Sequence, residues 1–576
     1  MRSSRFLFLM CLGASALLTS GCTEDDAAAA VEDNTTAPDN TTATDNTTAT
    51  DNETVVDAPL EFCAGQTTFL YDPLNTDFLG AFPDDYFTAD DPGTPTGLRV
   101  NFTETNTGWT QDIPDNFRPN IFELNDLDGW GTTAGIFLRF SEKLKTDWPS
   151  GEGSLDDDAV RLLRLEADGT VTDIAFTVTY VDDDTTAIVV PMVPLQPKTL
   201  HALLVTTDVV GDDGDCIAPS PALKGLLTAA ANAPGLQRLV PAYQAILEAT
   251  DLRADAISAA AVFTTQSIVD GDLAAAADIA ERSFAWSGDG PTCTEQADVM
   301  KCEGRFVGSD YRDGNEVFVD GKPQDSWEYP VSVWLPKTGT GPLPTLIFGH
   351  GIGGDRSQAG FLAPIVADLG FVVIAMDAVA HAQHPGGSGG GGQGDVLRFF
   401  GINIAIFGLD GLKLRDNWRQ SAFDKLQLVK LMHDDPDIDG DGAPDLDVDR
   451  IAYMGVSLGG IMGPALLALS DRIGAGILDV CGGRLSQIIT DSSDFSGLVA
   501  IAAGGSTAGD QARFFQMAQT LIERGDPANF APYLLRNRLP STGDRLPNVL
   551  MQIAMGDTTI PNSTSWYLAQ SMDLPQ

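Results

Sequence analysis

Short runs of β-forming residues, separated by turns that contain Asp or Gly, recur through the first part of the chain. The clearest runs are 135–140, 174–180 and 187–191. This spacing is typical of the antiparallel strands of a β-sandwich. Residues 220–285 then become Ala-rich, which predicts helices that are interrupted around 261–265. The pattern therefore predicts a mainly β, sandwich-like domain over 58–285.

The second part of the chain alternates strand-like apolar runs with helical stretches. The runs are 329–335, 345–348, 371–376, 450–454, 475–480 and 549–555. Such alternation over this length implies a mainly parallel sheet that is covered on both faces. We expect this α/β domain to occupy 309–576, after a polar connector at 286–308.

The first 22 residues have the layout of a secretion signal. Arg2 and Arg5 precede an apolar run from 6 to 18, which is too short to span a bilayer. Small residues then precede Cys22, as in the lipobox of bacterial lipoproteins. We expect Cys22 to carry lipid and to anchor the protein in the membrane of the cell envelope, at the outer membrane or the cell surface. A plain secretory signal is the alternative.

Residues 23–57 repeat Asp-Asn-Thr-Thr every six residues and have no apolar periodicity. Such a stretch cannot bury a core, so we expect a disordered polar tether. The Asn-X-Thr triplets also match glycosylation acceptors, but a solvated linker is the simpler interpretation.

Charge excludes one class of partner. Lys and Arg number 34 against 81 Asp and Glu, which gives a formal net charge of −47. A surface of this sign repels phosphate backbones, so we expect no nucleic acid as a partner. The oligomeric state stays open.

The seven cysteines fit an oxidising compartment. Cys293 and Cys302 close a short loop in the connector, which predicts a disulfide. Cys63 and Cys216 lie far apart in the first domain and are a candidate second pair. Cys481 follows an apolar strand, and we expect a buried free thiol there.

The strongest chemical signal is the stretch Gly-Val-Ser-Leu-Gly at 455–459. It follows the strand at 450–454 and precedes an apolar helix that starts near Gly460. A strained turn that exposes a nucleophile needs glycines beside the serine, because no Cβ atom fits against the sheet there. This context predicts Ser457 as a nucleophile.

A second glycine-rich stretch, Phe-Gly-His-Gly-Ile-Gly-Gly at 348–354, ends an earlier strand. It resembles the His-Gly oxyanion loop of lipases and esterases. We expect the backbone N–H groups of Gly351 and Leu458 to stabilise a tetrahedral oxyanion, and His350 to orient the loop. A glycine-rich turn without a catalytic role is the alternative.

Asp557 follows the last strand and comes after Ser457, which is the order of acid and nucleophile that such an elbow implies. It would fix the tautomer of a catalytic histidine and stabilise its charged form. Asp479, near the end of the preceding strand, is the reserve acid, and an ordinary turn aspartate is the alternative.

A triad of this kind also needs a histidine, and the sequence does not place one after the acid. The chain has five histidines, at 201, 350, 381, 384 and 433, and none follows Asp557. We expect the sequence to stop before a final strand and its histidine. The alternative is a site without a standard triad, for which His381 and His384 are the available substitutes, although pocket shaping is their simpler role.

An acidic loop precedes the strand of the nucleophile. Positions 1, 3, 5 and 9 of a calcium loop are matched by Asp437, Asp439, Asp441 and Asp445. Gly442 stands at position 6, but position 12 is Val448 rather than Glu. We predict a structural Ca²⁺ ion here, with a solvated acidic turn as the alternative, and no cofactor for the chemistry itself.

The Gly-rich stretch 386–394 is followed by apolar residues at 396–407. A hinge beside exposed apolar residues suits a lid over an acyl pocket. Core packing is the alternative.

Together these features resemble the bacterial virulence-factor lipase family, whose members are lipoproteins with a characteristic N-terminal domain ahead of an α/β-hydrolase. In the first domain the resemblance rests on Ala-Phe-Pro-Asp-Asp at 81–85, Pro-Leu-Gln-Pro-Lys-Thr at 194–199 and Phe-Thr-Thr-Gln at 263–266. In the second domain it rests on the His350 loop, Arg-Asp-Asn-Trp-Arg-Gln at 415–420 and Ser-Leu-Gly-Gly at 457–460. The chain departs from the family pattern at Val456, where lipases usually carry His, and in the missing terminal histidine.

The resemblance covers most of 58–576 and implies hydrolysis of carboxylic esters of lipids, including lysophospholipids. We therefore expect a serine esterase or lipase in which Ser457 attacks the ester, a histidine takes its proton and an acyl-enzyme is hydrolysed. A surface adhesion or scaffold lipoprotein with an inactive hydrolase fold is the alternative.

Overall fold

The computed structural model describes residues 58–574, apart from 339–340, 388–391, 404–407, 503 and 544. The predicted signal with Cys22 and the predicted tether lie outside the described residues. The chain divides into the units Met1–Pro59 and Leu60–Gln576, and the second contains all the structure described below. Within the described part of the chain, no helix is both long and apolar enough to cross a membrane.

The first half of this unit, residues 60–285, is called the sandwich half here. It contains two four-stranded antiparallel sheets with the orders β1-β4-β8-β7 and β10-β9-β5-β6, and a separate β2-β3 pair. The strands are β1 (Ala81–Phe82), β2 (Thr88–Asp90), β3 (Leu98–Val100), β4 (Ile136–Arg139), β5 (Val160–Leu165), β6 (Val171–Asp173), β7 (Phe176–Val181), β8 (Thr186–Pro191), β9 (Leu200–Thr206) and β10 (Ile257–Thr264).

Side chains from both sheets, such as Phe137, Val189, Leu203 and Phe263, are fully buried in one apolar cluster. The Ala-rich stretch is helical on both sides of β10, as predicted. The helices of this half are α1 (Arg118–Glu123), α2 (Pro221–Leu227), α3 (Pro234–Gln237), α4 (Val240–Thr250) and α5 (Asp270–Glu281). The mainly β first half therefore has the architecture that the hydrophobic pattern indicates.

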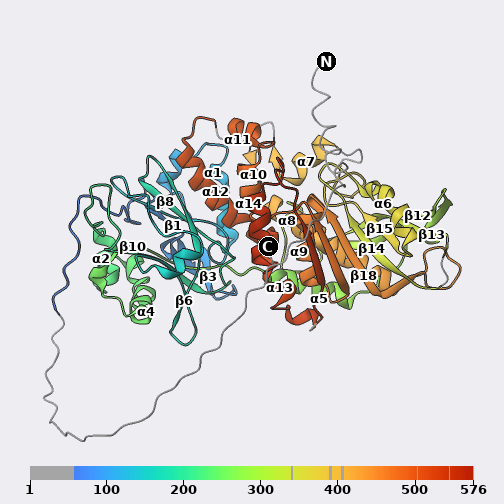
Figure 1. Ribbon diagram of the computed structural model, residues 1–576, viewed down its shortest axis with the longest axis horizontal. Coiled ribbons are helices and arrows are strands. Elements are labelled where there is room, and N and C mark those ends of the chain that lie inside the picture. Colours follow the sequence, from blue (N-terminus) through green and yellow to red (C-terminus); the bar gives the residue numbers. More distant parts are fainter. Residues whose placement is uncertain are drawn as a thin grey trace, which may run out of the picture. The chain divides into compact units, whose positions relative to one another are not determined.

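The second half is built on an eight-stranded sheet with the order β11-β12-β13-β15-β14-β18-β19-β20 (Figure 1). Its strands are β11 (Thr292–Glu295), β12 (Val299–Asp310), β13 (Asp325–Pro336), β14 (Leu343–Gly349), β15 (Val372–Met376), β18 (Leu446–Val456), β19 (Ile473–Asp479) and β20 (Asn548–Gln552). The five strands from β15 to β20 pair in parallel, whereas β13 is antiparallel to both of its neighbours. This mainly parallel sheet confirms the predicted α/β class.

Helices cover both faces of the sheet. The helices of this half are α6 (Ala359–Asp368), α7 (Gln393–Phe399), α8 (Gly411–Asp434), α9 (Leu458–Leu469), α10 (Leu485–Asp491), α11 (Ser496–Ala502), α12 (Ala508–Ile522), α13 (Pro532–Leu535) and α14 (Asn562–Ser571), with a short pair β16 (Ile402–Asn403) and β17 (Gly408–Leu409). Along β14, Leu346 and Phe348 belong to the cluster under α6, whereas Ile347 belongs to the cluster that contains α9. Successive side chains of a strand point to opposite faces, so α6 and α9 lie on opposite sides of the sheet.

The sheet begins earlier in the chain than predicted. The segment 286–308, expected as a connector, forms β11 and most of β12. Alternate positions of β12 carry Lys301, Glu303 and Arg305, because one face of this end of the sheet is open to solvent. These alternating charged residues resemble the composition of a polar linker, which is why the sequence predicts a connector here.

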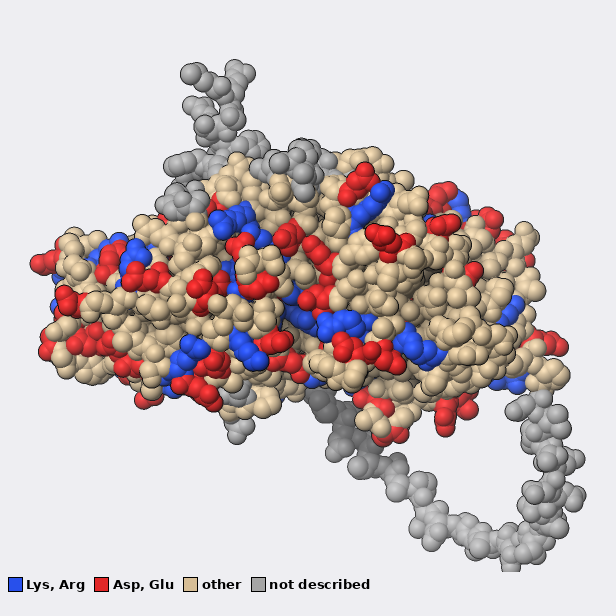
Figure 2. Space-filling view, turned by 180° about the vertical axis from the view of Figure 1, so that it is seen from behind, with Lys and Arg blue, Asp and Glu red and all other residues tan. Residues whose placement is uncertain are grey.

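A helical segment, residues 480–547 and called the insertion here, separates β19 from β20. It contains α10 to α13 and the short helices η7 (Glu523–Gly525), η8 (Pro527–Asn529) and η9 (Pro540–Thr542). The alternation of strands and helices predicts helical stretches between the last two strands, but it does not give their number or bounds. On the face shown in Figure 2, acidic side chains are widely spread and several Lys and Arg side chains lie beside them.

The structure joins Cys63 to Cys216 and Cys293 to Cys302. Cys481 is a buried free thiol. Cys293 and Cys302 face each other across β11 and β12, so the second disulfide links these two strands at the edge of the sheet.

Candidate active site

Ser457 stands between β18 and α9 with φ 52° and ψ −112°. A non-glycine residue with positive φ is strained, and a serine in such a strand-to-helix turn presents its side chain above the sheet. Its N–H donates to the carbonyl of Asp479 on β19, at 2.9 Å. The backbone geometry is thus that of a nucleophile elbow.

The neighbouring glycines explain why this turn can form. A Cβ atom on Gly455 would lie 2.2 Å from the carbonyl oxygen of Gly459, and one on Gly459 would lie 2.3 Å from the carbonyl oxygen of Gly349. Neither position can hold a larger residue without moving backbone. The buried hydroxyl of Tyr453 donates to the Gly459 carbonyl at 2.6 Å and supports the turn from below. Tyr453 was not singled out from the sequence, where it looks like any core strand residue.

The His350 loop lies directly beside this elbow. The Gly459 N–H donates to the His350 carbonyl at 3.0 Å. The His350 ring holds the loop as well, since Nδ1 is 2.8 Å from the Gly351 carbonyl and Nε2 accepts the Ala378 N–H at 2.9 Å. This pattern fixes the neutral tautomer with the proton on Nδ1. Burial, with a smaller contribution from His381, lowers the pKa of His350 to about 3.

Candidate donors for an oxyanion lie at both edges of the elbow. Leu458 is the first residue of α9, and the first N–H groups of a helix have no acceptor within the helix. The Gly351 N–H donates to the side-chain oxygen of Gln358 at 3.1 Å. The next amide, that of Ile352, has no acceptor among the described residues. Ile352 is therefore an open donor of this loop, whereas Gln358 would have to move before the Gly351 N–H could bind an oxyanion.

Asp557 lies in the turn between β20 and α14. Its Oδ1 accepts the N–H groups of Thr559 and Ile560, at 2.8 and 3.0 Å. Its Oδ2 accepts no hydrogen bond from the described residues, so one carboxylate oxygen remains for a partner. The geometry suits an acid that orients a histidine, but no hydrogen bond joins Asp557 to Ser457 or to a histidine within the described chain.

The reserve acid, Asp479, ends β19 next to the elbow. Its carbonyl holds the Ser457 N–H, and burial raises the pKa of its half-buried carboxyl group. Burial also raises the pKa of the neighbouring Cys481 thiol, which keeps that thiol protonated and unreactive.

The other four histidines have other partners. His201 belongs to β9 in the sandwich half, and the exposed His433 lies at the end of α8 beside Asp434. His384 contacts the Asp424 carboxylate through Nε2, at 3.0 Å, and accepts the Gly386 N–H through Nδ1. His381 contacts the Val379 carbonyl through Nδ1, whereas its buried Nε2 has no partner among the described residues.

The predicted lid is only partly described. Residues 388–391 and 404–407 lie outside the described residues. Phe399, at the end of α7, is fully buried and packs edge-on against His381 and Trp418, with ring centroids 5.4 and 4.9 Å apart. For Phe399 the structure therefore shows the core packing that was the alternative.

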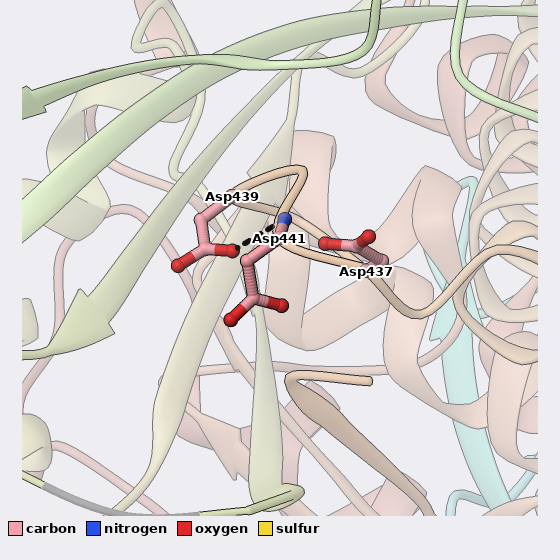
Figure 3. A group of neighbouring side chains, drawn as sticks. All are labelled: Asp437, Asp439 and Asp441. Carbon is pink, nitrogen blue, oxygen red and sulfur yellow. Dashed lines mark hydrogen bonds between the residues drawn. The ribbon is translucent and has the colours of Figure 1, made fainter. Parts of the chain in front are cut away.

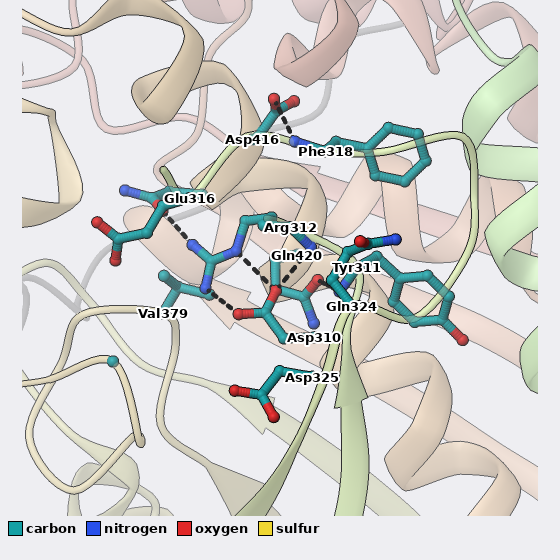
Figure 4. Close-up of polar contacts among 12 residues, drawn as sticks. Asp310, Tyr311, Arg312, Glu316, Phe318, Gln324, Asp325, Val379, Asp416 and Gln420 are labelled. Atoms are coloured by element: carbon teal, nitrogen blue, oxygen red, sulfur yellow. Dashed lines mark hydrogen bonds and ion pairs between the residues drawn. The ribbon is translucent and has the colours of Figure 1, made fainter. Parts of the chain in front are cut away.

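The Arg-Asp-Asn-Trp-Arg-Gln stretch of α8, 415–420, is buried throughout. The Asp416 carboxylate accepts the Phe318 N–H at 2.9 Å, and Gln420 accepts the Tyr311 N–H at 2.9 Å (Figure 4). These bonds tie α8 to the segment after β12. The stretch is a structural support that holds no direct bond to Ser457.

In the acidic loop before β18, Asp437, Asp439 and Asp441 each bring a carboxylate oxygen within 4.8 Å of the others (Figure 3). Hard oxygen donors at this spacing suit a divalent cation such as Ca²⁺. Asp445 is used differently, since its Oδ2 accepts the N–H groups of Ile438 and Asp439 at 2.7 and 3.2 Å. The structure thus gathers three of the four expected ligands.

No protein-family model and no curated protein sequence matches the chain. Solved structures similar to it include an acetyl xylan esterase from Paenibacillus sp. R4, with 18% identity, a TM-score of 0.34, and coverage of 54% of this chain and 86% of that one. Acetyl xylan esterase 1 from Thermoanaerobacterium sp. JW/SL YS485 has 18% identity, a TM-score of 0.32, and coverage of 53% and 84%. The chain has the α/β-hydrolase fold, because its mainly parallel sheet carries a strained Gly-X-Ser-X-Gly turn after β18.

Proposed function

We propose that this chain is a serine hydrolase of carboxylic esters that works through a covalent acyl-enzyme. The observation that carries the proposal is the backbone of Ser457, held at φ 52° and ψ −112° between β18 and α9. Strain of this kind costs about 1–3 kcal/mol and persists only where the surrounding structure enforces it. Such strained residues cluster at active sites.

In the proposed reaction a general base takes the Oγ proton of Ser457 while Oγ attacks the ester carbonyl carbon. The N–H groups of Ile352 and Leu458 receive the negative charge that develops on the carbonyl oxygen. The tetrahedral intermediate collapses as the protonated base gives its proton to the departing alcohol. The same base then takes a proton from water, which attacks the acyl-enzyme, and returns it to Oγ as the acid leaves. Asp557 orients the base through its open Oδ2.

The finer assignment follows the resemblance to virulence-factor lipases. We propose a lipase or esterase that cleaves lipid esters, lysophospholipids among them, and that is held at the cell envelope by lipid on Cys22. The structural Ca²⁺ at the Asp437 loop is part of the same proposal.

The test is labelling with a fluorophosphonate probe, followed by mass spectrometry of the modified peptide and by hydrolysis of a p-nitrophenyl ester panel. We expect the label on Ser457, and Ser457→Ala to lose both labelling and hydrolysis. Ser287→Ala, which changes a serine away from the site, should keep both. A wild-type protein that is folded but neither labelled nor active would contradict the proposal and favour an inactive scaffold.

A further inference from the structure

The carboxylate of Glu523 in η7 is fully buried and is held by one segment of the sandwich half. Its Oε1 accepts the N–H groups of Thr133 and Ala134, at 2.7 and 2.8 Å, and the Thr133 hydroxyl at 3.0 Å. Its Oε2 accepts the N–H and the hydroxyl of Thr132. A buried carboxylate is tolerated when donors surround it, and here all of them come from 132–134.

A second set of bonds continues from this point into the insertion. The Gln519 amide group donates to the Thr133 hydroxyl and to the Asp526 carboxylate, both at 2.9 Å. The fully buried Asp526 in turn accepts the N–H groups of Arg484 and Leu485, at 3.0 and 2.6 Å. The beginning of α10 is therefore fixed by carboxylate and amide groups whose own positions depend on the sandwich half.

The other end of α10 reaches the loop of Asp557. The Ser492 hydroxyl donates to the Thr558 carbonyl at 2.9 Å. The Asp494 carboxylate accepts the hydroxyls of Thr558 and Thr559, at 3.2 and 2.5 Å. Both threonines follow Asp557 directly, so a shift of α10 changes the position of this loop.

We propose that Glu523 is a positioning residue through which the sandwich half fixes the insertion and, through α10, the loop that carries Asp557. The role of Asp557 as the acid rests on the proposed function, whereas the mechanical connection does not. The sandwich half therefore helps to position the proposed hydrolase site. The connection runs from 132–134 through η7 and α10 to 557–559.

The test is hydrogen–deuterium exchange of the full chain, read in peptides from α10 and from the Asp557 loop. Glu523→Gln removes the charge and places an N–H₂ group among donors, so we expect exchange at least about tenfold faster at 484–494 and 556–562. Exchange in β14 should stay unchanged. The milder Thr133→Val should act in the same direction, and it keeps the test available if Glu523→Gln folds poorly.

The matched control is Arg513→Gln. Arg513 on α12 also contacts the sandwich half, through Asp182, but lies off the path through Gln519 and Asp526. It should leave the exchange of 556–562 unchanged. Asp494→Asn should accelerate 556–562 but not 519–526. Acceleration confined to 130–134 and 519–526, or an equal effect of Arg513→Gln, would overturn the proposal.

Activity gives a separate readout. If Asp557 orients a histidine, loosening its loop lowers the pKa of that histidine, because the carboxylate stabilises the charged ring. The acidic limb of the kcat/KM profile should then move to lower pH in Glu523→Gln and stay in place in Arg513→Gln. An unmoved limb in an active Glu523→Gln protein would remove the catalytic part of the proposal. An inactive wild type would contradict the proposed function, whereas the exchange result would still test the mechanical connection.

Discussion

Backbone contacts among β14, β18 and β19 hold Ser457 and the His350 loop in place. The strained angles of Ser457 are stabilised by the bond from its N–H to Asp479 and by the close approach of Gly459 to Gly349. The His350 ring is bonded at both nitrogens, so it can orient the loop but has no free nitrogen for proton transfer. Both residues lie in sequence motifs, and the hydrogen bonds show that the His350 ring is engaged at both nitrogens.

The buried ring of His350 should make stability depend on pH. The folded chain keeps the ring neutral down to a pKa of about 3, whereas the unfolded chain protonates it below its ordinary value of about 6.5. Between these values the unfolded state binds more protons, so stability is lost as pH falls. The free energy of unfolding of the wild type, relative to His350→Gln, should therefore shrink by up to about 1.4 kcal/mol per pH unit below 6.5.

Urea unfolding at pH 7, 6 and 5 measures this difference. The control is His433→Gln, which changes a histidine at the exposed end of α8. Parallel curves for the wild type and His350→Gln would contradict the assignment of a buried neutral ring.

Among the elements, α8 shows how tertiary contacts override a polar pattern. Arg415, Asp416 and Arg419 are buried in this helix because their charges pair with each other and with Asp126 and Asp272 of the sandwich half. Without partners, such burial would cost several kcal/mol per ion. A polar sequence therefore becomes a central helix only because the matching carboxylates arrive from elsewhere in the chain.

The acidic loop before β18 gives a prediction about an element. Asp437, Asp439 and Asp441 repel one another at this spacing, so a bound divalent ion stabilises the folded loop and the strand that leads to Ser457. The midpoint of thermal unfolding should rise in millimolar Ca²⁺ relative to EDTA. Asp439→Asn/Asp441→Asn should abolish this rise, whereas Asp183→Asn/Asp184→Asn, with the same change of charge, should keep it. Equal midpoints with and without Ca²⁺ would leave a plain acidic turn.

For the whole molecule, the sandwich half and the eight-stranded sheet belong to one compact unit, Leu60–Gln576. Contacts such as those of Glu523 with 132–134 and of Arg524 with Asp128 join segments that are far apart in the sequence. We expect the two halves to unfold together because neither carries its own partners for these buried charges.

Anchoring is a prediction about the whole molecule that rests on residues 18–22. Metabolic labelling with a palmitate analogue should tag the protein, because the cysteine of a lipobox receives lipid. Cys22→Ser should remove the tag, and Cys481→Ser, which alters the buried free thiol, should retain it. An untagged wild type would show an ordinary secretory signal instead.

The residues alone predict the class of the fold, several strands of the main sheet and the strained turn at Ser457. These follow from local rules: apolar periodicity defines strands and helices, and glycines flanking a serine after a strand define a strained turn. Three further features appear first in the folded chain: β12 belongs to the sheet, Gln358 accepts the Gly351 N–H, and Glu523 binds 132–134. Each of these depends on pairing between residues distant in the sequence, and a polar residue looks the same along the chain whether its partner is water or a buried donor.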